Sequence, residues 1–314
     1  MSLPVTVYRW DDAGAPQLTN GKPSEIIAIL KKCLVEGYGT KAGAGWSVAF
    51  ENAAAFKIAF RNSTTEASGG FVQFWSVDGT DANSANMRFR SAKSMTALDT
   101  FIDSQYQIQF NITTVVDYWV IVATSAGFWF LSTNTLASPY SSSNQKGLFF
   151  IGDFDAITAN DPGRFVNISS SAGADMTSHS WNSSFEVSVG PNSTICKIYD
   201  ADGSANFRNY NIDSRYNLGS QGVAGVPMGD RVFLQPLIIS GAGLDSNDRL
   251  GVINSNSIIQ PYIRGKVPGL LYSPSTGYSD QPWPVIESIN GQQYMLIPGY
   301  RFGRAWINLE TWYD

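Results

Sequence analysis

Residues 118–133 read YWVIVATSAGFWFLST, which is two apolar runs joined by the short segment Ser125-Ala126-Gly127. Aromatic and β-branched side chains dominate both runs, and strands favour these side chains. Two such runs separated by a few residues that include a glycine are typical of a β-hairpin. The stretch therefore predicts two antiparallel strands in the middle of the chain.

Similar short runs recur on both sides of this hairpin, with turn residues between them. They are FVQFWSV (71–77), NMRFRSA (86–92), GLFFIGDF (147–154), RFVNISS (164–170), FEVSVG (185–190), TICKIYD (194–200), ANFRNYNI (205–212), RVFLQPLII (231–239), SIIQPYIRG (257–265), QYMLIPG (293–299) and AWINLET (305–311). The segment 201–204 predicts a second hairpin, because Asp202-Gly203 supplies the positive φ that a tight turn needs. Short strands with regular turns favour an antiparallel sandwich or barrel over alternating strand–helix units. The predicted fold class is therefore mainly β.

One segment near the N-terminus has the period of an amphipathic helix instead. Apolar positions at helical spacing lie between a proline and a glycine: Pro23, Ile26, Ile27, Leu30, Cys33, Leu34 and Gly37. Proline suits the first turn of a helix, and glycine suits the left-handed residue just past its end. The pattern predicts one short helix over about residues 24–36.

A division into two β domains is expected near residue 160. Small polar residues crowd the segments 153–165 and 169–184, which read DFDAITANDPGRF and SSSAGADMTSHSWNSS. This composition predicts an N-terminal domain over 1–160, which holds the helix, and a C-terminal domain over 161–314. A long surface loop within one continuous domain would have the same composition.

Charge and hydropathy exclude two classes of partner. Charged residues make up 15% of the chain and the net charge is −5, so we expect no nucleic-acid binding, which needs clustered Lys and Arg. Polar residues interrupt every apolar stretch well before the ~18 residues that a spanning helix requires, so we expect no membrane insertion. The N-terminus lacks a basic region followed by an apolar one, so we expect a soluble protein made in the cytoplasm.

Residues that could supply chemistry are few. His179 is the one histidine and lies in a Ser-rich loop, which is a poor platform for a catalytic base. One His and two scattered Cys do not make a usual zinc site, and we expect Cys33 and Cys196 to be buried thiols rather than a disulfide. Asp200 to Ser204 resembles the start of a calcium loop but lacks its later ligands, so a hairpin turn is expected there. The sequence thus predicts no catalytic residue, metal or cofactor.

Asp153 and Asp155 are the candidate carboxylate pair. Side chains alternate along a strand, so the two would share one face, and glycoside cleavage uses a pair about 5–9.5 Å apart. The alternative is that the strand ends here and Asp155 begins a turn with Asn160-Asp161-Pro162-Gly163. The structural interpretation is favoured, because acidic pairs beside turns are common.

Aromatic residues reach 13%, with nine Trp. A low charge with many aromatics is typical of an aromatic β core, and also of surfaces that are buried against partners. Composition favours the core. Exposed aromatics next to amides also build shallow sugar sites, and the candidates for a glycan or partner contact are Trp181, Asn182, Tyr278 and Trp283.

Residues 8–61 contain a series of residues that together form a recognisable pattern: Tyr8, Arg9, Asp12, Ala13, Gly14, Ala15, Pro16, Cys33, Leu34, Val35, Gly37, Tyr38, Gly39, Ala44, Gly45 and Trp46. In this pattern the chain resembles a family of bacteriophage virion proteins found in the tails of Mu-like and related siphophages and prophages. The match is densest over residues 8–61. Sparser matches cover 118–123, 128–131, 149–154 and the segment Ile263 to Leu270, whereas residues from about 165 to 250 depart from the family pattern.

The resemblance implies a structural role near the tail tip or baseplate, with the virion as the location and with no reaction attached. The expected partners are other virion proteins and copies of the chain itself, in a ring or a trimer. Two alternatives stay open at this point. One is a module that binds a host-surface glycan as the phage receptor, and the other is a tail-associated enzyme that degrades glycans.

Overall fold

The computed structural model describes residues 2–83, 86–111, 118–137, 145–169, 175–176, 195–213, 234–241, 263–273, 278, 281–297 and 304–313. Within these ranges the chain is mainly β, with antiparallel sheets and one short helix near the N-terminus, as predicted. The predicted strand at 185–190 lies outside the described residues. No helix in the described ranges is long and apolar enough to cross a membrane.

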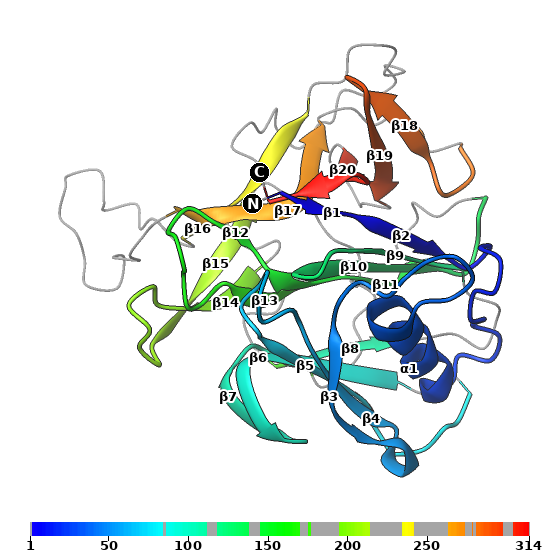
Figure 1. Ribbon diagram of the computed structural model, residues 1–314, viewed down its shortest axis with the longest axis horizontal. Coiled ribbons are helices and arrows are strands. Elements are labelled where there is room, and N and C mark those ends of the chain that lie inside the picture. Colours follow the sequence, from blue (N-terminus) through cyan, green and yellow to red (C-terminus); the bar gives the residue numbers. More distant parts are fainter. Residues whose placement is uncertain are drawn as a thin grey trace.

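The predicted hairpin at 118–133 is confirmed and forms the middle of a five-stranded sheet (green in Figure 1). Phe128 pairs with Ala123 at its closed end, and Thr133 pairs with Tyr118 at the other. The order of strands in this central sheet is β13 (Phe165–Ile168), β11 (Gln145–Asp153), β10 (Gly127–Thr133), β9 (Tyr118–Ala123) and β2 (Thr6–Arg9). β13 comes after residue 160 in sequence, so this sheet contains residues from both sides of the predicted domain boundary.

Two further sheets lie on either side of the central one (Figure 1). The six-stranded sheet contains β3 (Ser47–Asn52), β4 (Lys57–Arg61), β5 (Phe71–Ser76), β6 (Asn86–Ala97) and β7 (Thr100–Ser104) in that order, and β8 (Ile108–Asn111) pairs with β6. The eight-stranded sheet runs in the order β14 (Ile195–Tyr199), β15 (Phe207–Asp213), β16 (Gln235–Gly241), β17 (Ile263–Ser273), β20 (Arg304–Asn308), β19 (Gln292–Ile297) and β18 (Ile286–Ile289), and β12 (Asp155–Ala156) pairs with β17. β14 and β15 form the second predicted hairpin, and Gly203 in its turn has a φ of 81°.

The central sheet is buried on both faces because its two middle strands are apolar at almost every position. On one face, Trp119, Ile121, Phe128 and Phe130 join a core cluster with the helix and the six-stranded sheet. On the other face, Val120, Val122, Trp129 and Leu131 join a second cluster with the eight-stranded sheet. Alternate residues of a strand point to opposite faces, so an unbroken apolar run contributes side chains to both clusters. The result is a three-layered β structure.

The predicted helix is confirmed over its full span. The α-helix α1 (Pro23–Lys31) continues as one π-helical turn η1 (Lys32–Glu36), and Gly37 follows with a φ of 81°. Ile26, Leu30 and Leu34 are fully buried between the central and six-stranded sheets. Cys33 and Cys196 are buried free thiols, as expected.

The loop after the helix is fastened to β2 by the carboxylate of Asp12. This carboxylate accepts hydrogen bonds from the backbone N–H of Arg9 (2.7 Å), the Tyr38 hydroxyl (2.8 Å) and the Lys41 ammonium (2.6 Å). Burial opposes the charge, but the three donors prevail and the pKa of Asp12 lies below its usual value. Gly39 completes the contact, because a Cβ there would lie 2.5 Å from the carbonyl oxygen of Ala13.

An ion pair without solvent contact ties β17 to the turn that follows β12. The Arg264 guanidinium donates two hydrogen bonds to the Asp161 carboxylate, at 2.8 and 2.6 Å, and both side chains have no exposed area. Arg264 also donates to the Tyr210 hydroxyl at 3.4 Å. Asp161 lies in the turn predicted over residues 160–163, where its carboxylate also accepts the Gly163 N–H.

The two ends of the chain lie side by side. β1 (Leu3–Pro4) pairs with β21 (Thr311–Trp312), close to the middle of β17 (Figure 1). The C-terminal segment is thereby fixed on the eight-stranded sheet, where it helps to shape the site described below.

We predict that Arg264→Ala lowers the free energy of unfolding by about 3–5 kcal/mol, because it leaves the Asp161 carboxylate buried without its cation. Urea denaturation measures this loss. Arg9→Ala is the matched control: Arg9 also donates two hydrogen bonds to one carboxylate, that of Asp11, but this pair is partly exposed and should contribute less than about 1 kcal/mol. An equal loss in the two variants would contradict the role given to the buried pair.

We also predict that Asp12→Asn destabilises the protein in a pH-dependent way. A carboxyl group with a lowered pKa stabilises the fold above its unfolded-state pKa of about 3.9, and this contribution disappears as the pH falls through the folded-state value. The variant should therefore lose about 1–3 kcal/mol at neutral pH and approach the wild type below about pH 4. Thermal unfolding across this range measures it, with Asp11→Asn as the exposed control. A difference that stays constant with pH would refute the assignment.

Candidate functional site

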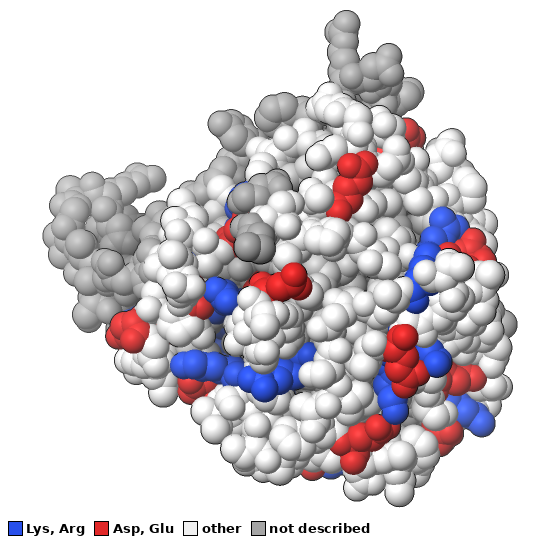
Figure 2. Space-filling view, in the orientation of Figure 1, with Lys and Arg blue, Asp and Glu red and all other residues white. Residues whose placement is uncertain are grey.

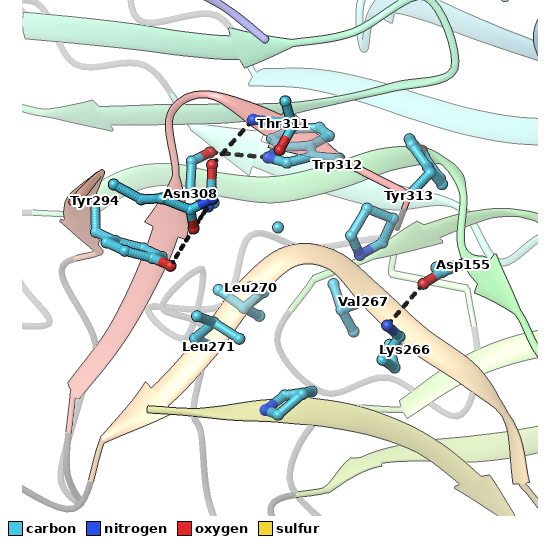
Figure 3. A pocket seen from close by; sticks show the side chains of 14 residues that line it. Asp155, Lys266, Val267, Leu270, Leu271, Tyr294, Asn308, Thr311, Trp312 and Tyr313 are labelled. Carbon is cyan, nitrogen blue, oxygen red and sulfur yellow. Dashed lines mark hydrogen bonds and ion pairs between the residues drawn. The ribbon is translucent and has the colours of Figure 1, made fainter. Parts of the chain in front are cut away.

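An inner strand of the eight-stranded sheet departs from regular pairing. Between the pairs Ile238↔Lys266 and Pro236↔Leu271, β16 advances by two residues (238 − 236) while β17 advances by five (271 − 266). Three extra residues therefore bulge out of β17, and pairing with β20 begins at Leu270. We call residues 266–270 the arch, after the curve of the ribbon in Figure 3. Pro268 suits it, because proline has no N–H to donate to a ladder.

Two buried tryptophans hold the arch in place. The indole N–H of Trp129, from the central sheet, donates to the carbonyl oxygen of Pro268 at 3.4 Å. The indole of Trp312, from β21, lies so close to Gly269 that a Cβ there would be 2.0 Å from its nitrogen. Gly269 also has a φ of 66°, which favours glycine. The arch is thus shaped by side chains of the core.

A pocket of about 130 Å³ lies between the arch and the C-terminal segment. We call it the arch pocket. At one end, the Lys266 ammonium lies 3.0 Å from the Asp155 carboxylate, and these side chains are 44% and 22% exposed. Figure 3 shows this ion pair on one side of the pocket, the polar groups of Tyr294, Asn308 and Thr311 on the other, and apolar side chains of the arch between them.

The polar end is organised by a chain of hydrogen bonds. The Tyr294 hydroxyl donates to Oε1 of Gln292 at 2.8 Å, and the Asn308 amide donates to the same oxygen at 3.0 Å. Oδ1 of Asn308 accepts the backbone N–H groups of Glu310 and Thr311. These bonds fix the orientation of each group, so the pocket presents both donors and acceptors at defined positions.

A second hollow, of about 280 Å³, lies on the other side of Asp155 and is bordered by Asp153 and Arg164. The Asp153 carboxylate accepts from the Asn62 amide (3.3 Å), the Ser68 N–H (2.8 Å), the Ser68 hydroxyl and Arg164 Nε (2.8 Å). Burial raises the pKa of Asp153, while the bonds from Ser68 and Arg164 act in the opposite direction. These contacts join β11 to the loops after β4 and β12, which is a structural role.

The prediction that Asp153 and Asp155 share a face of one strand is wrong. β11 ends at Asp153, and Asp155 begins β12, which pairs with β17 in a different sheet. The two carboxylates have separate partners, Arg164 and Lys266. Of the alternative, the end of the strand at Asp153 and the turn at residues 160–163 are confirmed, whereas Asp155 begins a short strand and not the turn.

The aromatic candidates for a sugar contact have different positions. Trp283 is only 3% exposed, because it stacks on Trp10 with ring centroids 5.3 Å apart, so the expectation of an exposed platform is wrong for this residue. Tyr278 is half-buried and packs edge-on against Trp306. Trp181 and Asn182 lie outside the described residues, as does His179.

Sequence reasoning missed the arch pocket. It considered Asp155 only as the partner of Asp153, and Lys266 only as part of the segment Ile263 to Leu270, so it did not connect these two residues, which are far apart in the chain. One signal was present: Pro268-Gly269 lies inside a segment that pairs as a strand, and such a pair marks a bulge or the close approach of another group.

We predict that Gly269→Ala destabilises the protein by about 1–3 kcal/mol more than Gly291→Ala does. Both glycines have a positive φ, so alanine is strained at either position, but a Cβ at Gly291 meets no atom within 4 Å. The difference in unfolding free energy between the two variants isolates the contact with Trp312. Equal losses would show that Trp312 does not press on the arch.

Comparison with known proteins does not assign the chain to a family. No protein-family model matches the chain, and no curated protein matches it in sequence. The proposals below therefore depend on the contacts described above and on the resemblance of the N-terminal stretch.

Proposed function

We propose that the chain is a structural component of a bacteriophage virion, in the tail tip or baseplate region. It acts through contacts with copies of itself and with other virion proteins. The resemblance of residues 8–61 to tail proteins supports the location. In the structure, Asp12, Tyr38 and Gly39 from this stretch fasten the helix to the central sheet, so the residues that carry the resemblance have an architectural role.

The observation that carries the proposal is that two large exposed apolar side chains, Ile102 and Ile286, lie on strands that are outermost among those the structure describes. Ile102 is 47% exposed on β7, at one edge of the six-stranded sheet. Ile286 is 38% exposed on β18, at one edge of the eight-stranded sheet. An outermost strand has backbone donors and acceptors that can pair with another chain, and exposed apolar side chains favour such pairing.

The surface charges also suit close packing of copies. Charged side chains form pairs of opposite sign, such as Lys31–Glu51 and Lys57–Asp99. In Figure 2 positive and negative residues lie next to one another, with wide uncharged areas between them. Local neutrality limits the repulsion between neighbouring copies, and uncharged areas can be buried at low desolvation cost.

We predict that Ile102→Lys and Ile286→Lys weaken self-association, because a lysine on an outermost strand opposes strand pairing. Native mass spectrometry across a concentration series should show a ring or trimer for the wild type and smaller species for one or both variants. Ile157→Lys is the control, since Ile157 is 67% exposed but does not belong to any strand. A wild type that stays monomeric at every concentration, or an equal effect of all three substitutions, would argue against assembly through these strands.

The location has its own test. Particles purified from the bacterium that encodes the chain should contain it, as detected by peptide mass spectrometry after gradient separation. Absence from purified particles would contradict the virion assignment, whatever the result in solution.

A further inference from the structure

We propose that the arch pocket binds one ring of a neutral carbohydrate. This goes beyond the structural role above, because it gives the eight-stranded sheet a specific ligand site. The argument has three parts: the arrangement of polar groups, the balance of charge, and the size and rigidity of the pocket.

The polar groups of the pocket match vicinal hydroxyls. Lys266 donates and Asp155 accepts at one end, 3.0 Å apart, so one hydroxyl or two neighbouring ones can bond to both. At the other end, the hydroxyls of Tyr294 and Thr311 both donate and accept. A sugar ring has hydroxyls of the same dual character around its edge.

The balance of charge favours a neutral ligand. Lys266 and Asp155 compensate each other, so a carboxylate or phosphate drawn to the lysine would be repelled by the aspartate. A cation drawn to the Asp155 carboxylate would likewise be repelled by the Lys266 ammonium. Hydroxyl groups carry no net charge and still form charge-assisted hydrogen bonds with both side chains.

The size and rigidity of the pocket limit the ligand to a single ring. A volume of about 130 Å³ is well below the ~300–1,000 Å³ of pockets that enclose drug-sized molecules. The floor is held by Trp129 and Trp312, and the polar end by Asn308. A preformed site of this kind loses little entropy on binding. The ring would therefore be a terminal or side-branch unit of a larger glycan.

The experiment uses the full chain and a panel of methyl glycosides of common neutral hexoses, N-acetylhexosamines and deoxyhexoses, with those of hexuronic acids as the acidic comparison. Saturation-transfer NMR at millimolar sugar identifies the members that bind, and titration gives their affinity. Lys266→Met keeps the aliphatic stem and removes the ammonium, so we expect about tenfold weaker binding. Tyr294→Phe should weaken binding by a smaller factor. Lys31→Met is the matched control, because Lys31 also pairs with a carboxylate at 3.0 Å and belongs to α1, which lies away from β17 (Figure 1).

Binding by the wild type and by Lys31→Met, with loss in Lys266→Met, would support the proposal. No saturation transfer from any sugar in the panel would overturn it, as would equal binding by the wild type and Lys266→Met. Binding confined to acidic sugars such as hexuronic acids would overturn the neutral class. Thermal unfolding of each variant shows whether a loss reflects the pocket or the fold. None of these results bears on assembly or on presence in the particle, which are measured separately.

Discussion

The structure depends on a central sheet that has no face in contact with water. Phe128 and Phe130 pack toward the helix and the six-stranded sheet, whereas Trp129 and Leu131 pack toward the eight-stranded sheet. Neither face can remain exposed, since each fully buried aromatic or aliphatic side chain contributes about 1.5–3 kcal/mol. Both outer layers are therefore needed to complete the core. This explains why the sheets are not divided at residue 160: β13 belongs to the central sheet, and the next described strand, β14, belongs to the eight-stranded sheet.

The packing of the central sheet against the eight-stranded sheet also determines the shape of the arch pocket. Trp129 packs in the core and its indole N–H also donates a hydrogen bond to the Pro268 carbonyl oxygen. The central sheet therefore helps to fix the position of the arch. Arg264 fixes the start of β17 through its buried pair with Asp161, and Trp312 covers Gly269 from the C-terminal side. The pocket thus owes its shape to core contacts rather than to surface loops. Its form should be stable as long as the layers stay packed.

The sequence was sufficient for elements with a strong period and insufficient for contacts between distant segments. The central hairpin and the helix carry unmistakable apolar patterns, and both lie where they were predicted. β3 and β4 were missed, because the intervening Ala53–Ala55 breaks the strand pattern and alanine favours helices. Trp283 was misjudged because its exposure depends on Trp10, from the opposite end of the chain. The Lys266–Asp155 pair was invisible for the same reason, since only the pairing of β12 with β17 brings it together.

The arch differs from the outermost strands in its effect on the stability of the fold. An exposed isoleucine on β7 or β18 disturbs no hydrogen bond, because the outer side of such a strand is unpaired in any sheet. β17 lies between β16 and β20, and the bulge of three residues interrupts its ladder with β16. It also requires a glycine of positive φ under a tryptophan. A strand that only had to complete the sheet would be more stable without these features. The arch is therefore a place where the fold departs from what stability alone favours, and such departures are typical of binding sites.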